Sequence, residues 1–106
     1  MSVLITAATS AQAYKLKATI SADEKVVLGD YLDLPAIMLK NGTMIKTPAP
    51  ENVSFAHLML TLCMDNQITQ IYPLRRAELD LLLEAKTLFA EFDITLCTPP
   101  NEFLID

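Results

Sequence analysis

The sequence predicts a single α/β domain built on a parallel β-sheet. Its 106 residues suit one domain of ordinary size. Short apolar runs rich in β-branched residues alternate with segments of helical character, and this alternation is typical of strand–helix–strand units whose strands lie parallel. A hydrophobic content of 52% provides ample apolar surface to bury. We therefore expect one domain, spanning residues 1–106.

Each expected element has its own local signal. Strands are expected at five apolar runs, residues 2–7, 25–29, 43–47, 68–72 and 94–97. Helices are expected over residues 10–18, 35–40, 54–66 and 76–92, of which the last is the longest. Ser10 and Ser54 suit the N-cap positions of the first and third helices. Asn41 and Gly42 form a turn signal after the second helix, and consecutive prolines at 99–100 end the regular pattern.

The order of these strands follows from the handedness of their connections. Right-handed crossovers favour a three-layer Rossmann-like parallel sheet of about five strands, with strand order 3-2-1-4-5. The short segment between the second and third strands leaves little helix for its crossover. In such sheets ligands bind at the carboxyl ends of the strands, where the order reverses. The predicted crevice therefore lies between residues 8–12 and residues 73–78.

Charge and composition exclude several classes of function. The net charge of −5 disfavours nucleic acid, and the only adjacent basic pair is Arg75 and Arg76. No apolar run approaches the roughly 20 residues needed to cross a bilayer. No basic region precedes the first apolar run, as it would in a signal peptide. We expect a cytoplasmic protein that contacts neither nucleic acid nor membrane.

The two cysteines indicate neither a metal site nor a disulfide. Cys63 and Cys97 have no CxxC or Cys/His spacing, and metal sites need three or four ligands. In a cytosolic protein they are interpreted as reduced, partly buried thiols. No metal is expected in this chain.

The loop after the first strand lacks the glycines of a dinucleotide site. Only Gly29 and Gly42 occur in the chain, and neither lies in residues 7–12. The hydroxyls of Thr9 and Ser10, with helix N–H groups, could hold a small anion. Plain N-capping by Ser10 is the commoner use of such a residue and is favoured. Asp30 follows the second strand, where Rossmann enzymes place a ribose-binding acid; without the glycines, a role in the turn at residues 31–33 is favoured.

The loop after the fourth strand is the most informative segment. A continuous helix over residues 76–92 places Glu78 in its first turn, at the positive end of the helix dipole and in the middle of the apolar face. That face carries Leu81, Leu82, Ala85, Leu88, Phe89 and Phe92. Two interpretations stay open: Glu78 serves the crevice, or it caps its own helix or pairs with Arg75. The candidate residues of a substrate cleft are Thr9, Ser10, Asp30, Arg75, Arg76 and Glu78.

No catalytic residue is assigned. Two of the expected helices also carry more apolar residues than one contact with the sheet would bury. The only histidine, His57, lies with Thr61 and Asp65 on a polar stripe that is expected to face water. The rest of the helix over residues 54–66 is apolar around most of its circumference. The outer residues Leu60, Met64, Leu79 and Leu83 are expected to be partly exposed. They are candidates for an interface, either in a homo-oligomer such as a dimer or with a separate chain.

Several runs together resemble a known family. They are VLITAA at residues 3–8, AYKL at 13–16, VLGDY at 27–31, PAIMLK at 35–40 and YPLRRAE at 72–78. They resemble the N-terminal, or preATP-grasp, domain of ATP-grasp enzymes similar to the carbamoyl-phosphate synthase large subunit. The resemblance covers nearly the whole chain.

The resemblance implies a function shared with a second domain. In the family a Rossmann-like domain precedes an ATP-grasp domain, which binds ATP and magnesium and makes an acyl-phosphate that an amine or similar nucleophile attacks. The preATP-grasp domain shapes the substrate side of the cleft, and Arg75, Arg76 and Glu78 match the loop that borders it. The ATP-binding lysines and metal-binding acids have no counterpart here. ATP and magnesium are therefore expected only with an ATP-grasp domain or chain.

Three functions are accordingly open. The first is a non-catalytic module of a carboxylate–amine ligase, as a fragment or split protein without its downstream ATP-grasp domain and not active alone. The second is a free-standing small-ligand or nucleotide-binding domain that uses the crevice. The third is a protein-association domain that acts through the apolar helices. A phosphate-receiver domain is disfavoured, because residues 7–9 supply no acid after the first strand.

Overall fold

The five strands form one parallel sheet in the order expected. The computed structural model describes residues 2–20 and 23–105. The strands are β1 (Ser2–Ile5), β2 (Lys25–Asp30), β3 (Met44–Lys46), β4 (Ile68–Tyr72) and β5 (Thr95–Leu96). Their order is β3-β2-β1-β4-β5, and each neighbouring pair is parallel, which confirms the predicted α/β, Rossmann-like sheet.

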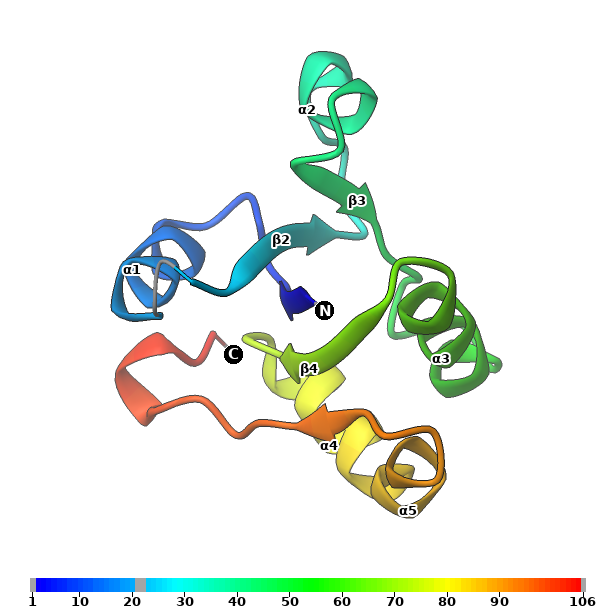
Figure 1. The fold of residues 1–106 in the computed structure, drawn as a ribbon. Coiled ribbons are helices and arrows are strands. Elements are labelled where there is room, and N and C mark those ends of the chain that lie inside the picture. The colour runs from blue at the N-terminus through cyan, green and yellow to red at the C-terminus, as the bar shows by residue number, and fades with distance from the viewer. Residues whose placement is uncertain (1, 21–22, 106) are drawn as a thin grey trace.

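Helices cover both faces of this sheet. In chain order the helices are α1 (Ala11–Thr19), α2 (Ala36–Lys40), α3 (Phe55–Asp65), α4 (Arg76–Glu84) and α5 (Lys86–Ala90), followed by the 3₁₀ helix η1 (Asn101–Phe103). α2 buries no residue and lies beyond the β3 edge (Figure 1). Figure 1 shows α1 and η1 on one side of the sheet and α3 and α5 on the other. Two apolar clusters correspond to these two faces, one packed under α1 and one under α3, α4 and α5.

The strand register explains why β1 is buried at every position, its polar first residue Ser2 included. Leu4 lies beside Ile71 of β4, and both belong to the cluster under α3 and α4. Ile5 lies beside Leu28 of β2, and both belong to the cluster under α1. Successive strand residues point to opposite faces, so a central strand with helices on both sides buries all of its side chains.

The expected continuous helix over residues 76–92 is wrong. α4 ends at Glu84 and α5 begins at Lys86, because Ala85 has the non-helical angles φ −101° and ψ 14°. The expected apolar face is nevertheless confirmed as far as residue 89, because its first five members all belong to or contact one core cluster: Leu81, Leu82, Ala85, Leu88 and Phe89. Phe89 is fully buried, whereas Phe92 lies beyond the last helical residue and is exposed.

The two expected helix caps have different outcomes. Ser10 caps α1 as predicted, since its Oγ accepts the Ala13 N–H at 3.4 Å. Ser54 precedes α3, but its side chain makes no capping bond. Asn52 organises this turn instead: its Oδ1 accepts the Ser54 N–H at 2.8 Å, and its carbonyl accepts the Phe55 N–H at 3.0 Å.

Two of the four expected outer leucine and methionine positions are buried. Met64 and Leu83 are 52% and 41% exposed, as expected. Leu60 and Leu79 are only 7% and 5% exposed, so the expectation of partial exposure is wrong for them. Leu60 belongs to the core cluster under α3, and Leu79 lies one turn before the buried Leu82 on α4. The buried faces of α3 and α4 are therefore wider than the spacing of apolar residues in the sequence indicates.

The segment after β5 returns to the sheet, which the sequence analysis did not predict. Phe103 and Ile105 pack against the cluster under α1. The Ile105 N–H donates to the Leu74 carbonyl at 2.7 Å, and the Arg76 N–H donates to the Ile105 carbonyl at 2.8 Å. Within residues 2–20 and 23–105, no helix is both long and apolar enough to span a membrane.

Candidate functional site

The carboxyl ends of β1, β2 and β4 bring a group of polar side chains together. β1 lies between β2 and β4, so the segments that follow these three strands meet at one edge of the sheet. Thr9 follows β1, Asp30 ends β2 and Arg75 follows β4. This is the reversal point of the strand order, where the sequence analysis placed its crevice.

Asp30 is the centre of this group and is fully buried. Its Oδ2 accepts hydrogen bonds from the Thr9 N–H at 3.0 Å and from the Thr9 hydroxyl at 2.8 Å. Its Oδ1 accepts the Leu32 N–H at 3.2 Å, which confirms the expected role of Asp30 in the turn after β2. The carboxylate thereby connects the loops after β1 and β2.

Arg75 completes the coordination of Asp30 from the third loop. Its Nη1 donates to Asp30 Oδ1 at 2.6 Å and its Nη2 to Oδ2 at 3.3 Å, the two-pronged geometry that guanidinium and carboxylate favour. The guanidinium carbon also lies 4.8 Å from the centre of the Tyr31 ring. A cation over an aromatic face gains further attraction. The positive charge of Arg75 is thus held on two sides by residues from the end of β2.

The ionisation of this pair follows from its hydrogen bonds. Burial by itself raises the pKa of Asp30, but the hydrogen bonds from Arg75, Thr9 and Leu32 outweigh burial and lower the pKa below its usual 3.8. Burial by itself lowers the pKa of Arg75, and the hydrogen bond and charge of Asp30 more than reverse this effect. Both groups are therefore charged at neutral pH, and the ion pair is partly buried, because Asp30 is covered and Arg75 keeps some exposed surface.

Glu78 has a different environment, although it lies only one turn away. Its side chain is fully buried, and neither carboxyl oxygen has a hydrogen-bond partner among the described residues. Burial raises its pKa to about 6. The Thr6 hydroxyl and the Arg75 guanidinium and N–H lie near enough to favour the ionised form and to limit that rise, whereas the charge of Asp30 adds to it. Glu78 is consequently a buried acid whose charge Thr6 and Arg75 compensate only in part.

Thr6 links the segments after β1 and β4 from inside the sheet. It is fully buried, and its hydroxyl oxygen accepts the Leu74 N–H at 2.8 Å. This bond fixes the start of the segment that carries Arg75 and Glu78. Sequence reasoning did not single out Thr6 or Tyr31. The only available signal was a threonine directly after an apolar strand and an aromatic residue directly after Asp30.

The structure therefore separates the six residues proposed for a substrate cleft. It brings Thr9, Asp30 and Arg75 into direct contact and places Glu78 inside the fold beside them. Ser10 caps α1 and also donates its hydroxyl hydrogen to the Ala7 carbonyl at 2.7 Å. Arg76 is exposed, and its backbone pairs with Ile105. Because both loop hydroxyls are used and a carboxylate adjoins Thr9, the anion site considered for this loop is disfavoured.

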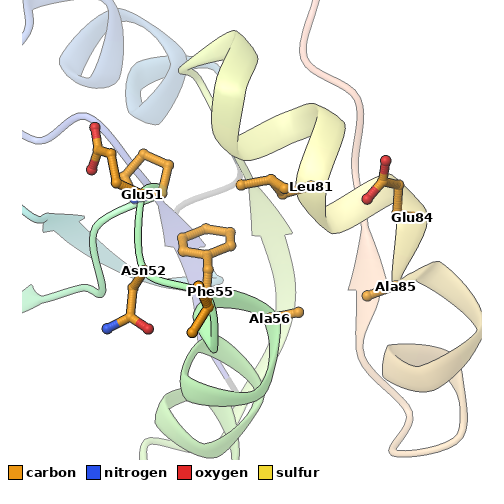
Figure 2. A pocket seen from close by; sticks show the side chains of 9 residues that line it. Glu51, Asn52, Phe55, Ala56, Leu81, Glu84 and Ala85 are labelled. Atoms are coloured by element: carbon orange, nitrogen blue, oxygen red, sulfur yellow. The ribbon is translucent and has the colours of Figure 1, made fainter.

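A cavity lies between α3 and α4, away from this network. Its volume is about 390 Å³. Figure 2 shows Leu81 extending from α4 towards the ring of Phe55, with Ala56 and Ala85 facing each other across the gap between the helices. The cavity is lined by Pro50, Glu51, Asn52, Val53, Phe55, Ala56, Leu81, Glu84 and Ala85. Sequence analysis gave no signal for it, because its walls come from segments about 30 residues apart.

The cysteines and acids form no metal centre within the described ranges. Residues 2–20 and 23–105 contain no group of three or more His, Cys, Asp or Glu side chains that could hold an ion. Cys63 and Cys97 are both free thiols. Cys63 is fully buried in the core, and burial raises its pKa to about 12. A thiol that stays protonated at neutral pH is a poor nucleophile.

Comparison with known proteins assigns no relative. No model of a known protein family matches this chain, and no curated protein matches it in sequence. The function is therefore argued from the geometry and from the resemblance in the motifs.

Proposed function

We propose that this domain is a non-catalytic module of a cytoplasmic ATP-dependent carboxylate–amine ligase, and that it shapes the substrate side of the cleft beside a separate ATP-grasp domain or chain. The role follows the resemblance of the motifs to preATP-grasp domains. The parallel sheet in the order β3-β2-β1-β4-β5 is compatible with it.

One observation carries the proposal: the polar groups at the carboxyl edge bind one another. Asp30 receives five hydrogen bonds, from Thr9, Leu32 and Arg75. A catalytic edge needs groups that can reach a substrate, whereas these groups hold three loops in one arrangement. Such an edge suits a preorganised wall against which another domain positions its substrate.

The first loop also does not fit a triphosphate. Ala7 and Ala8 are buried, so their methyl groups belong to the core, where a phosphate cradle would have glycines. The Asp30 carboxylate lies 3.0 Å from the Thr9 nitrogen, which is an N–H group that a phosphate would otherwise use. ATP and magnesium are therefore assigned to the partner, and this chain contributes the shape and charge of the adjoining wall.

The test is reconstitution with an ATP-grasp protein encoded next to this chain. We expect the two purified proteins to form a complex in analytical ultracentrifugation, and ADP release from the ATP-grasp protein to rise when this chain is added. The matched variant is Arg76→Gln, which changes an exposed residue of the segment that matches the family loop. It should weaken the stimulation while the fold remains intact by circular dichroism.

Two results would refute the module role. One is the absence of an ATP-grasp coding sequence both from this reading frame and from its neighbours. The other is a neighbouring ATP-grasp protein whose sedimentation and ADP release are unchanged by this chain.

A further inference from the structure

The cavity between α3 and α4 has a largely apolar interior. Phe55 lies at its base and is 2% exposed, while Ala56, Leu81 and Ala85 line its walls and are partly buried. Val53 at its edge is fully exposed. The volume of about 390 Å³ falls within the range of sites for small molecules, which are mostly apolar with a few polar groups.

The charged groups of this cavity have one sign. Glu51 comes from the loop before α3 and Glu84 from the end of α4, and no Lys or Arg lines the cavity. Figure 2 shows Glu51 and Glu84 at opposite ends of the lining, with the Glu51 carboxylate directed away from Leu81 and Phe55. Neither carboxylate forms an ion pair among residues 2–20 and 23–105. A cation in the cavity would therefore be attracted by the charges of both acids, and no base in the lining would oppose this attraction.

The loop wall of the cavity is preformed. Besides the two hydrogen bonds that Asn52 accepts, its own N–H donates to the Ala49 carbonyl at 3.0 Å. The opposite wall includes Ala85, where the helical break between α4 and α5 turns the chain. A site that exists before binding does not require the ligand to order it.

We propose that this cavity binds a small organic cation, with the apolar body of the ligand against Leu81 and Ala85 and its ammonium group on the side of Glu84, while the charge of Glu51 adds to the negative potential. The inference does not rest on the proposed module role. A mostly apolar lining whose only charges are negative complements an alkyl- or arylammonium ion. The volume favours a free small molecule over a lysine side chain of a partner protein.

The test is a set of nuclear magnetic resonance titrations of the ¹⁵N-labelled chain with three ligands of similar shape. They are phenethylammonium, 2-phenylethanol and phenylacetate, which carry a positive, a zero and a negative charge. We expect saturable shifts at the amides of Val53, Phe55 and Ala85. Phenethylammonium should bind on the order of fivefold more tightly than the alcohol; the difference is small because an exposed ion pair contributes little free energy. Phenylacetate should bind weakest, because the acids repel its negative charge.

Three variants separate charge from shape. Glu51→Gln with Glu84→Gln should reduce the affinity for phenethylammonium to that for the alcohol. Glu91→Gln removes an exposed acid outside the cavity and should leave both affinities unchanged. Ala85→Leu fills the cavity and should abolish the shifts from both ligands without changing the charge.

Several results would overturn the proposal. They include equal affinity for the three ligands, shifts centred elsewhere, or equal effects of the Glu91 variant and the double variant. A glycine-flanked lysine peptide that shifts the same amides at lower concentration than phenethylammonium would instead assign the cavity to a protein partner.

Discussion

Replacing Glu78 by Gln should stabilise the fold at neutral pH. The carboxyl group is fully buried and has no hydrogen-bond partner among the described residues, so the folded state holds its charge at a cost. From sequence alone Glu78 is a first-turn acid that gains about 0.3–1 kcal/mol from the helix dipole. Its surroundings reverse the expected sign of its contribution.

The size of the effect follows from the shift in pKa. Burial raises the pKa of Glu78 from 4.5 to about 6. Each pKa unit corresponds to about 1.4 kcal/mol, so the ionised side chain lowers the free energy of unfolding by about 2 kcal/mol above neutral pH. Because the folded state holds the proton more tightly, the full stability is present below pH 4.5 and is lost as pH rises through about 6.

The assay is urea unfolding of the wild type and Glu78 variants at about pH 5 and about pH 7.5, which bracket this titration. Wild-type stability should be higher at the lower pH, and Glu78→Gln should remove most of that difference. Glu78→Met, of similar volume and without polar atoms, should do the same even if the Gln amide lacks a partner. Glu91→Gln, at an exposed acid, is the control.

The interpretation of Glu78 would be wrong if wild-type stability did not change between these two pH values. It would also be wrong if both Glu78 variants were less stable than the wild type at the higher pH. Either result would mean that the carboxylate has stabilising partners in solution.

The remaining predictions concern the ion pair and two backbone positions, each measured by urea unfolding. Arg75→Met leaves the buried Asp30 carboxylate without its cation, although the hydrogen bonds from Thr9 and Leu32 remain, and should cost about 1.5–3 kcal/mol. The added change Asp30→Asn should restore much of this loss, and a loss below about 1 kcal/mol contradicts the prediction. Gly29→Ala places a methyl group 2.7 Å from Thr47 Cγ2 and should cost about 1–3 kcal/mol, whereas an unchanged stability would show that the core yields there. Gln67 follows α3 with φ 56°, so Gln67→Gly should stabilise by about 0.5–1 kcal/mol and Gln67→Ala should not; equal effects would exclude backbone strain as the cause.

The sheet could be predicted from the sequence because its signals are local. Each strand is a short apolar run, and right-handed crossovers leave few possible orders for five parallel strands. The break at Ala85 could not be predicted, since neither glycine nor proline occurs between residues 76 and 92 to mark it. The return of Ile105 to the Arg76 backbone is a long-range pairing without a local signal.

The candidate site could be predicted in position but not in its pairings. The reversal of strand order placed Thr9, Asp30 and Arg75 at one edge, and the structure brings them together. Periodicity also placed Glu78 on the inner face of its helix. Arg75 and Asp30 are 45 positions apart in the sequence. Their contact depends on how the loops after β2 and β4 are placed relative to each other, and no local sequence pattern predicts that placement.

The central claim is that the groups at the carboxyl edge bind one another rather than a phosphate. Isothermal titration of ATP with magnesium into the 106-residue chain tests this claim most directly. The Asp30–Arg75–Thr9 network predicts no saturable heat at micromolar nucleotide and no ADP release. Micromolar binding that is lost in a Thr9→Val variant would contradict it, because the loop would then serve a nucleotide.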